Sequence, residues 1–239
     1  QTNLTPDCAI LVATVRALKM HGGVERDTLE PENISGLEKG CANLARHVEN
    51  LRKFGVPTIV AINRFSTDTR AEVESLHQFC AEIDVDVIDC DHWAVGSAGA
   101  VDLAEAVVAL TNSKLSKFEL LYPDNMALWD KARTIAQQIY GARGIIADQR
   151  IRERFSELQE SGHGNLPVCI AKTQYSFSTD PNLKGAPSNH VVPIREVRLA
   201  AGAGFVIVVC GDIMTMPGLP RPPAAEQIFL DEHGKIAGL

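Results

Sequence analysis

The chain has 239 residues, of which 45% are hydrophobic and 22% are charged, and its formal net charge at pH 7 is −7. This length allows one large domain or two small ones. The negative charge argues against a nucleic-acid partner, which requires clustered Lys and Arg, and the lack of a long apolar run or a signal peptide predicts a cytoplasmic protein without membrane contact.

The first half of the chain alternates apolar segments with amphipathic ones. Predicted strands occupy residues 8–14, 57–62 and 86–90, and predicted helices occupy residues 33–54, 69–83 and 101–110. The first two strands are continuous apolar runs, which is typical of parallel strands covered on both faces. The alternation predicts a parallel, Rossmann-like sheet with flanking helices and right-handed crossovers.

The character of the sequence changes after residues 111–113. Helices are predicted at 126–140 and 148–161, the second of them charged and solvated, and strands at 166–171, 191–199 and 205–209. Residues 211–223 hold four prolines and two glycines and are predicted as an irregular apolar loop, followed by a hairpin at 226–238. We therefore expect an α/β domain over residues 1–112 and a smaller α+β domain over residues 113–239.

Polar and aromatic side chains follow the predicted strands at the edge where parallel sheets bind ligands. Asn63 and Phe65 follow the second strand, Trp93 follows the third, and Arg16 and Lys19 follow the first. Ligands of open α/β sheets lie outside the carboxyl ends of the strands. Two rings on neighbouring loops would then enclose a flat heterocycle whose edge the Asn63 amide reads. The alternative is that Asn63 caps its strand and the rings fill gaps beneath the loops.

Motifs for several common chemistries are missing. A GxxxxGK[ST] loop, a GxGxxG loop after a strand, GxSxG, HExxH and Cys-His zinc patterns do not occur in the 239 residues. The six cysteines are scattered without a CxxC pair, which indicates free thiols in a reducing cytoplasm and no metal site. No catalytic residue is assigned from the sequence.

Residues 12–23, VATVRALKMHGG, resemble a signature of the formate–tetrahydrofolate ligase family. The resemblance continues through residues 33–65, 166–176 (LPVCIAKTQYS), 214–223 (MTMPGLPRPP) and 234–239. It covers essentially the whole chain but less than half of the family's chain, and the sequence begins with Gln1 in place of Met. We therefore expect a C-terminal portion that lacks the N-terminal domain with the ATP-binding P-loop.

The resemblance implies an ATP-dependent ligase with a sheet of the P-loop NTPase-superfamily type. In this family ATP, with Mg2+, phosphorylates formate, and the formyl phosphate then formylates N10 of tetrahydrofolate. Phe65 and Trp93 match the aromatic residues that stack on the pterin ring, and Asn63 is a candidate for reading the nucleotide base. The resemblance also implies a homo-oligomer, often a tetramer. It assigns no role to the motif residues Lys172, Thr173 and Gln174.

One departure from the family lies after Trp93. Where the family has GGxGG, this chain has residues 96–100, GSAGA. If the backbone there adopts φ > 0 or approaches a ligand, Ser97 and Ala100 hinder it and alter folate or nucleotide binding. Two further hypotheses remain: a non-catalytic folate-binding or assembly module, and an unrelated α/β scaffold, which the twelve-residue signature disfavours.

Overall fold

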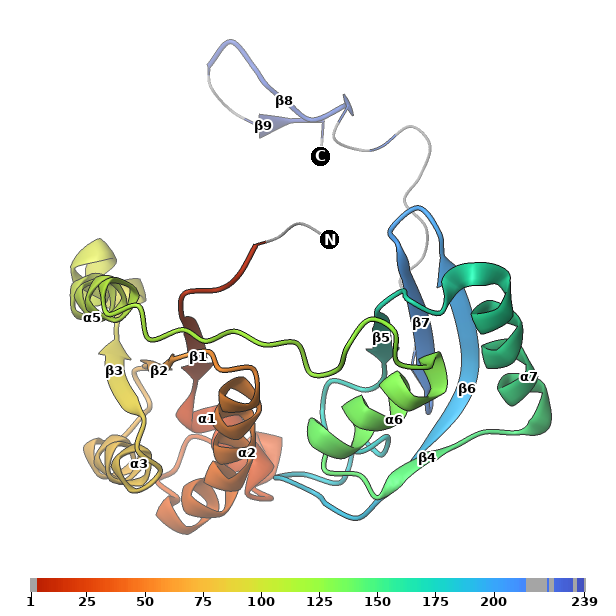
Figure 1. Cartoon of the computed structure of the whole chain (residues 1–239). Helices are drawn as coiled ribbons and strands as arrows, with labels where there is room; N and C mark the ends of the chain where they lie inside the picture. The colour runs from red at the N-terminus through yellow and green to blue at the C-terminus, as the bar shows by residue number, and fades with distance from the viewer. Residues whose placement is uncertain (1–3, 214–222, 224–225, 234–235, 239) are drawn as a thin grey trace.

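The computed structural model describes residues 4–213, 223, 226–233 and 236–238 (Figure 1). Its first half is a sheet of parallel strands in the order β1-β2-β3. The strands are β1 (Ala9–Ala13), β2 (Thr58–Asn63) and β3 (Asp86–Cys90), and the helices are α1 (Val15–His21), α2 (Ile34–Lys53), α3 (Arg70–Glu82), α4 (His92–Val95) and α5 (Val101–Asn112). The predicted α/β fold, with a parallel sheet and flanking helices, is confirmed.

One face of this sheet carries the core of the first half. Apolar side chains of β1 and β2 pack there against α1, α2 and α3, among them Val60, Ile62, Leu37, Leu44 and Leu76. Successive strand residues point to opposite faces, so Ile59 and Ala61 face the other side, where α5 contacts β2 and β3. On that side Ile10 and Val12 of β1 are 45% and 63% exposed, since the described residues leave this part of the face open.

Local contacts fix where the helices lie. The Thr69 hydroxyl accepts a hydrogen bond from the Glu72 backbone N at 3.2 Å, and the Glu72 carboxylate accepts one from the Thr69 backbone N at 3.1 Å. This is the predicted capping box at the start of α3. Helices α1 and α2 touch at glycines, because a Cβ added to Gly40 would lie 1.7 Å from the Leu18 carbonyl oxygen.

The second half is built on a mixed sheet of four strands in the order β4-β6-β7-β5. The strands are β4 (Gly144–Ile146), β5 (Val168–Ala171), β6 (Val191–Ala200) and β7 (Phe205–Cys210), and the helices are α6 (Leu128–Gln138) and α7 (Gln149–Leu158). Strands β4 and β6 are parallel, as are β5 and β7, whereas β6 and β7 are antiparallel. The predicted terminal hairpin consists of β8 (Phe229–Leu230) and β9 (Ile236–Ala237).

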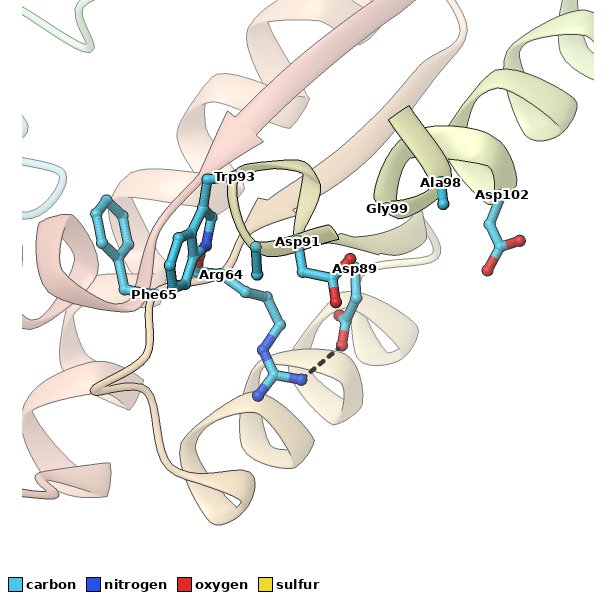
Figure 2. Close-up of a pocket in the computed structure, with 9 residues that line it drawn as sticks. Arg64, Phe65, Asp89, Asp91, Trp93, Ala98, Gly99 and Asp102 are labelled. Atoms are coloured by element: carbon cyan, nitrogen blue, oxygen red, sulfur yellow. Dashed lines mark hydrogen bonds and ion pairs between the residues drawn. The ribbon is translucent and has the colours of Figure 1, made fainter. Parts of the chain in front are cut away.

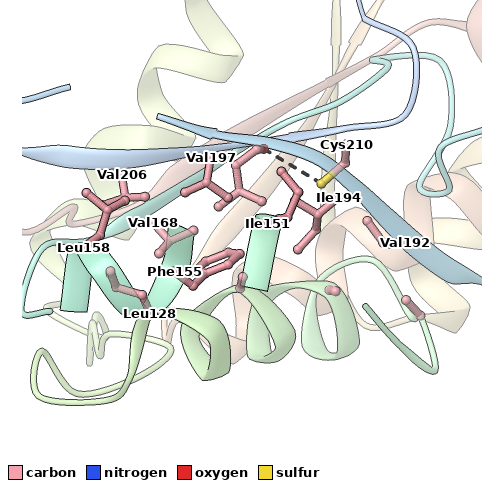
Figure 3. Close-up of a cluster of buried hydrophobic side chains, with 14 residues drawn as sticks. Leu128, Ile151, Phe155, Leu158, Val168, Val192, Ile194, Val197, Val206 and Cys210 are labelled. Carbon is pink, nitrogen blue, oxygen red and sulfur yellow. Dashed lines mark hydrogen bonds between the residues drawn. The ribbon is translucent and has the colours of Figure 1, made fainter. Parts of the chain in front are cut away.

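One expectation for this half is corrected, and one strand is missing from the sequence-based prediction. Helix α7 is not a solvated helix, because Ile151, Phe155 and Leu158 are buried in the core between α6, α7 and the sheet (Figure 3). Strand β4 is not predicted, since its three residues are too few to show a pattern. The proline-rich motif at 214–223 lies outside the described residues except for Pro223.

Helix α2 joins the two halves. Its Asn43 side chain donates to the Gly185 carbonyl at 2.8 Å, and its Asn50 side chain donates to the Ile139 carbonyl at 2.9 Å. These asparagines are two helical turns apart and therefore share one face of α2. Lys53, at the end of the helix, donates to the Gln138 carbonyl at 2.5 Å. The second half is thus held along the length of α2.

A helical stretch at residues 92–112 is more apolar than expected. It is 21 residues long, and an 18-residue window within it has a mean hydropathy of 1.4 and is not buried inside the protein. By length and composition alone this stretch could cross a membrane. A single stretch of this kind is weak evidence for a membrane span. It is interrupted at Gly96, whose φ is 69°, and it carries Asp102 and Glu105.

Candidate functional site

The carboxyl ends of the three parallel strands meet at one edge, as the sequence predicts. Ala13 pairs in register with Ile62, and Asn63 pairs with Cys90. The backbone N of Arg64 extends this pairing by donating to the Cys90 carbonyl at 2.9 Å. The loops that follow β2 and β3 therefore leave the sheet side by side.

These two loops enclose a hollow of about 450 Å³, which we call the aromatic hollow (Figure 2). It is lined by Arg64, Phe65, Asp89, Asp91, Trp93, Ala94, Ala98, Gly99 and Asp102. The structure thus brings Phe65 and Trp93 to the same hollow from different loops. This volume lies within the range of small-molecule sites.

The Phe65 and Trp93 side chains are accessible, and hydrogen bonds hold the residues that carry them. Phe65 is 37% exposed and Trp93 is 57% exposed. The Trp93 indole N–H donates to the Arg64 carbonyl at 2.6 Å, which ties its loop to the loop that carries Phe65. The Phe65 backbone N donates to Asp68 at 2.8 Å, and the guanidinium carbon of Arg16 lies 5.5 Å from the centre of the Phe65 ring. Phe65 is thus anchored through its backbone and Trp93 through its indole N–H, while both side chains remain accessible.

The rest of the aromatic hollow is acidic. Asp89 is shared by Arg64 at 3.2 Å and by His77 Nε2 at 2.7 Å. Asp91 and Asp102 also line the hollow. Burial raises the pKa of the neighbouring Cys90 thiol, and the three aspartates raise it further. Such a site accepts hydrogen bonds from N–H and NH2 groups of a flat heterocycle and repels phosphate.

The loop at residues 96–100, which the resemblance leads us to expect to differ from the family pattern, shows no left-handed backbone at Ser97 or Ala100. Gly96 has a φ of 69°, in the region that favours glycine, and a Cβ on Gly99 would lie 2.7 Å from backbone atoms of Asp91 and His92. Ala100 has a φ of −125°, and Ser97 is not among the described non-glycine residues with positive φ. The two positions that demand glycine thus retain it, and the substitutions at Ser97 and Ala100 fit the backbone.

Other residues singled out from the sequence lie elsewhere. Asn63 is half-buried at the end of β2 and is not among the residues that line the aromatic hollow. Lys172, Thr173 and Gln174 line a different cavity. Lys19, expected at the sheet edge, is instead 1% exposed beneath it.

An ion pair that the sequence does not indicate lies below the site. Lys19 Nζ lies 2.7 Å from a carboxylate oxygen of Glu72, and both side chains are buried. Lys19 also donates to the Pro31 carbonyl at 2.8 Å, and Glu72 accepts from the Asn33 backbone N at 2.9 Å. This pair fixes α1 against the start of α3. No sequence spacing indicates it, because its members are 53 residues apart.

No group of three or more His, Cys, Asp or Glu side chains is arranged to hold a metal ion within the described part of the chain.

Comparison with known proteins gives a consistent result. The family described as formate–tetrahydrofolate ligase matches residues 1–239. A formate–tetrahydrofolate ligase of Granulibacter bethesdensis is 58% identical over 239 residues, which are 100% of this chain and 42% of that protein. Those of Mesorhizobium japonicum and Methylobacterium nodulans are 55% and 58% identical, with 43% of each covered. The chain therefore spans less than half the length of these relatives.

Proposed function

Because the chain belongs to the formate–tetrahydrofolate ligase family, we propose that it forms part of an enzyme that uses ATP to join formate to tetrahydrofolate. The intermediate is formyl phosphate and the product is 10-formyltetrahydrofolate. ATP with Mg2+ is the co-substrate of the whole enzyme. Since the 239 residues contain no GxxxxGK[ST] loop, the phosphoryl chemistry belongs to residues outside this chain, and the chain alone is inactive.

In this proposal the chain contributes the folate site. The observation that carries it is the convergence of Phe65 and Trp93, from adjacent loops, on one hollow at the carboxyl edge of a parallel sheet. The rings stack on the pterin and add about 0.5–1.5 kcal/mol each beyond simple burial. The aspartates of the hollow accept hydrogen bonds from the pterin N–H and NH2 groups.

Such binding assists the reaction by orientation. A pterin held between two anchored rings presents N10 in a fixed direction, and fixing two reactants in this way lowers the barrier of a bimolecular step. The excess of carboxylates over the single guanidinium disfavours phosphate inside the hollow. The formyl phosphate therefore approaches from the mouth of the hollow, and Asn63, at the end of β2, is the candidate contact for the nucleotide base.

A tetrahydrofolate titration followed by tryptophan fluorescence tests the folate site. The chain has two tryptophans, and Trp129 packs on Phe155 in the other half with ring centres 5.3 Å apart. In a Trp129→Phe background, Trp93 is the sole reporter and should show saturable quenching. Phe65→Ala should weaken binding about two- to tenfold, the equivalent of one stacked ring.

The matched control is Phe229→Ala, since Phe229 is exposed but lies outside the hollow. Equal affinities for Phe65→Ala and Phe229→Ala would contradict the proposed stacking. The ligase assignment is tested separately by measuring ATP- and formate-dependent product formation. The chain alone should show none, and a protein extended to the length of the relatives should show turnover.

A further inference from the structure

A second cavity lies between the two halves and is not part of the aromatic hollow. Its volume is about 280 Å³, near the lower end for ligand sites. We call it the basic cavity; it is lined by His21, Asn43, His47, Tyr140, Ile170, Lys172, Thr173, Gln174, Ser176 and Phe177. These residues come from the end of α1, from α2, from the residues after α6, and from the end of β5 and the loop that follows it.

Three basic side chains converge on this cavity, and their positions are fixed. His21 Nδ1 accepts a hydrogen bond from the Gly185 backbone N at 3.3 Å, so the neutral ring carries its proton on Nε2. The His47 ring packs on Phe177 with centres 4.7 Å apart. Lys172 Nζ donates to the Thr173 carbonyl at 3.0 Å and to the Ser176 carbonyl, and it lies 4.6 Å from the centre of the Tyr140 ring.

Within the part of the chain that the structure describes, no acidic side chain lines the cavity, since none of the lining residues is Asp or Glu. Burial raises the pKa of Tyr140 to about 12 and that of the nearby Cys210 thiol to about 12, so both groups are neutral at pH 7. Basic groups enclosed without a counter-charge are costly in a protein interior.

Further positive charges surround the cavity. Arg46, on α2, lies 5.7 Å from the centre of the Phe177 ring, and Lys184, on the loop after β5, acts on His21. Burial lowers the pKa of His190, and Lys172 and Arg46 lower it further. Burial lowers the pKa of His47, and His21 and Lys172 lower it further. Burial likewise lowers the pKa of His21, with Lys184 adding to it, and lowers the pKa of Lys172 to about 8. An anion would relieve this repulsion.

We propose that the basic cavity binds an oxyanion, the phosphate or carboxylate group of a small ligand, between His21, His47 and Lys172. Asn43 is held in place at the wall of the cavity by the hydrogen bond that its side-chain N–H donates to the Gly185 carbonyl. The ligand contacts both halves of the chain, so its binding ties α2 and the end of α1 to the loop at 172–177. This site is separate from the proposed folate site, and neither of the two proposals depends on the other.

Anion binding at this site is coupled to proton uptake. An anion favours the protonated form of His47, so binding raises the pKa of this imidazole and takes up a proton. His21 contributes the N–H of its Nε2 without gaining a proton, because its Nδ1 accepts from the Gly185 backbone N. The affinity therefore rises as the pH falls, by about tenfold per pH unit for each proton taken up. The affinity of a site formed only by a permanently charged group would not change with pH in this way.

Isothermal titration calorimetry with sulfate tests the proposal. Sulfate keeps its double negative charge between about pH 6 and pH 8, so any change of affinity with pH comes from the protein. Wild type is compared with His47→Gln and His21→Gln, and His163→Gln serves as the control outside the cavity. Sodium chloride of equal ionic strength corrects for screening. We expect saturable binding that is stronger at about pH 6. His47→Gln should show a smaller change of affinity with pH, His21→Gln should bind more weakly because it loses the Nε2 donor, and the control should not differ from wild type.

Competition against bound sulfate identifies the source of the oxyanion. Displacement by inorganic phosphate alone assigns a phosphate group, and displacement by glutarate alone assigns a carboxylate. No saturable sulfate binding, equal binding in all four proteins, or displacement by neither competitor would overturn the proposal. Circular dichroism of each variant confirms that it is folded, so a lost signal reports on the site.

Discussion

The buried ion pair between Lys19 and Glu72 allows a sharp test of what holds α1 against α3. Glu72→Gln keeps the shape of the side chain, but it removes the negative charge and replaces one of the two acceptor oxygens by an NH2 donor. In wild type one oxygen accepts from Lys19 and Asn33 and the other accepts from the Thr69 backbone N. With the amide oxygen turned toward Lys19, which is 1% exposed, the variant leaves a buried ammonium without a counter-charge.

The size of the effect follows from burial. Removing one member of a buried pair costs about 3–5 kcal/mol. We expect about 3 kcal/mol here, because the Gln oxygen still accepts one hydrogen bond and Lys19 keeps its bond to Pro31. For a chain of this length, this corresponds to a Tm lower by roughly 6–12 °C.

The matched control is on the same helix. Glu74 forms an ion pair with Arg70 at 2.6 Å, but its side chain is 62% exposed. Glu74→Gln should change Tm little, because exposed ion pairs contribute little to stability. The measurement is thermal unfolding followed by circular dichroism. If Glu72→Gln lowers Tm no more than Glu74→Gln does, the argument from burial is wrong.

Three further predictions concern pH, close packing and the second core. Burial pushes the pKa of Glu72 up, but the hydrogen bonds from Lys19 and from the backbone outweigh it and leave the pKa below its usual value. The ionised Glu72 carboxylate therefore stabilises the folded chain above its unfolded-state pKa, and this contribution is lost as the pH falls through its folded-state pKa. Below about pH 4.5, acid titration should therefore lower the stability of Glu72→Gln less than that of wild type. Gly40→Ala should lower the free energy of unfolding, measured in urea, by about 1–3 kcal/mol, because its Cβ would lie 1.7 Å from the Leu18 carbonyl oxygen. Gly144→Ala is the control; it has open space around it and should change this free energy by no more than about 0.5 kcal/mol. Phe155→Ala should lower the free energy of unfolding by about 3–5 kcal/mol, because this side chain is 3% exposed in the core of the second half. A loss under about 1 kcal/mol would contradict that packing.

The sequence predicts the part of the fold that local patterns determine. The apolar runs of β1 and β2 and the capping box at Thr69 each lie within a few residues, so their signals are readable. Placing Phe65 and Trp93 on one edge follows from parallel strand order alone. The buried face of α7 was also readable, because Ile151, Phe155 and Leu158 recur at helical spacing, but the surrounding charges outweighed it in the prediction. The boundary between domains at residue 112 stays a prediction.

Features that need distant residues could not be found this way. The Lys19–Glu72 pair and the contact between His21 and Gly185 join residues 53 and 164 positions apart. A single sequence shows each of these residues only as a polar position. The Asp89 carboxylate likewise acquires its partners, Arg64 and His77, from two other elements. Which charges meet is decided by how helices pack, and no spacing along the chain reports it.

Helix α1 connects the two candidate sites. It has seven residues and is therefore about 10 Å long. Arg16, near its start, lies against Phe65 at the aromatic hollow, and His21, at its end, lines the basic cavity. Between them Lys19 is held by Glu72, so the position of α1 depends on α3 as well as on the glycine contact with α2. A shift of this helix would move one side chain at each of the two sites. A substitution at His47, which lies on α2, would alter the basic cavity without moving α1.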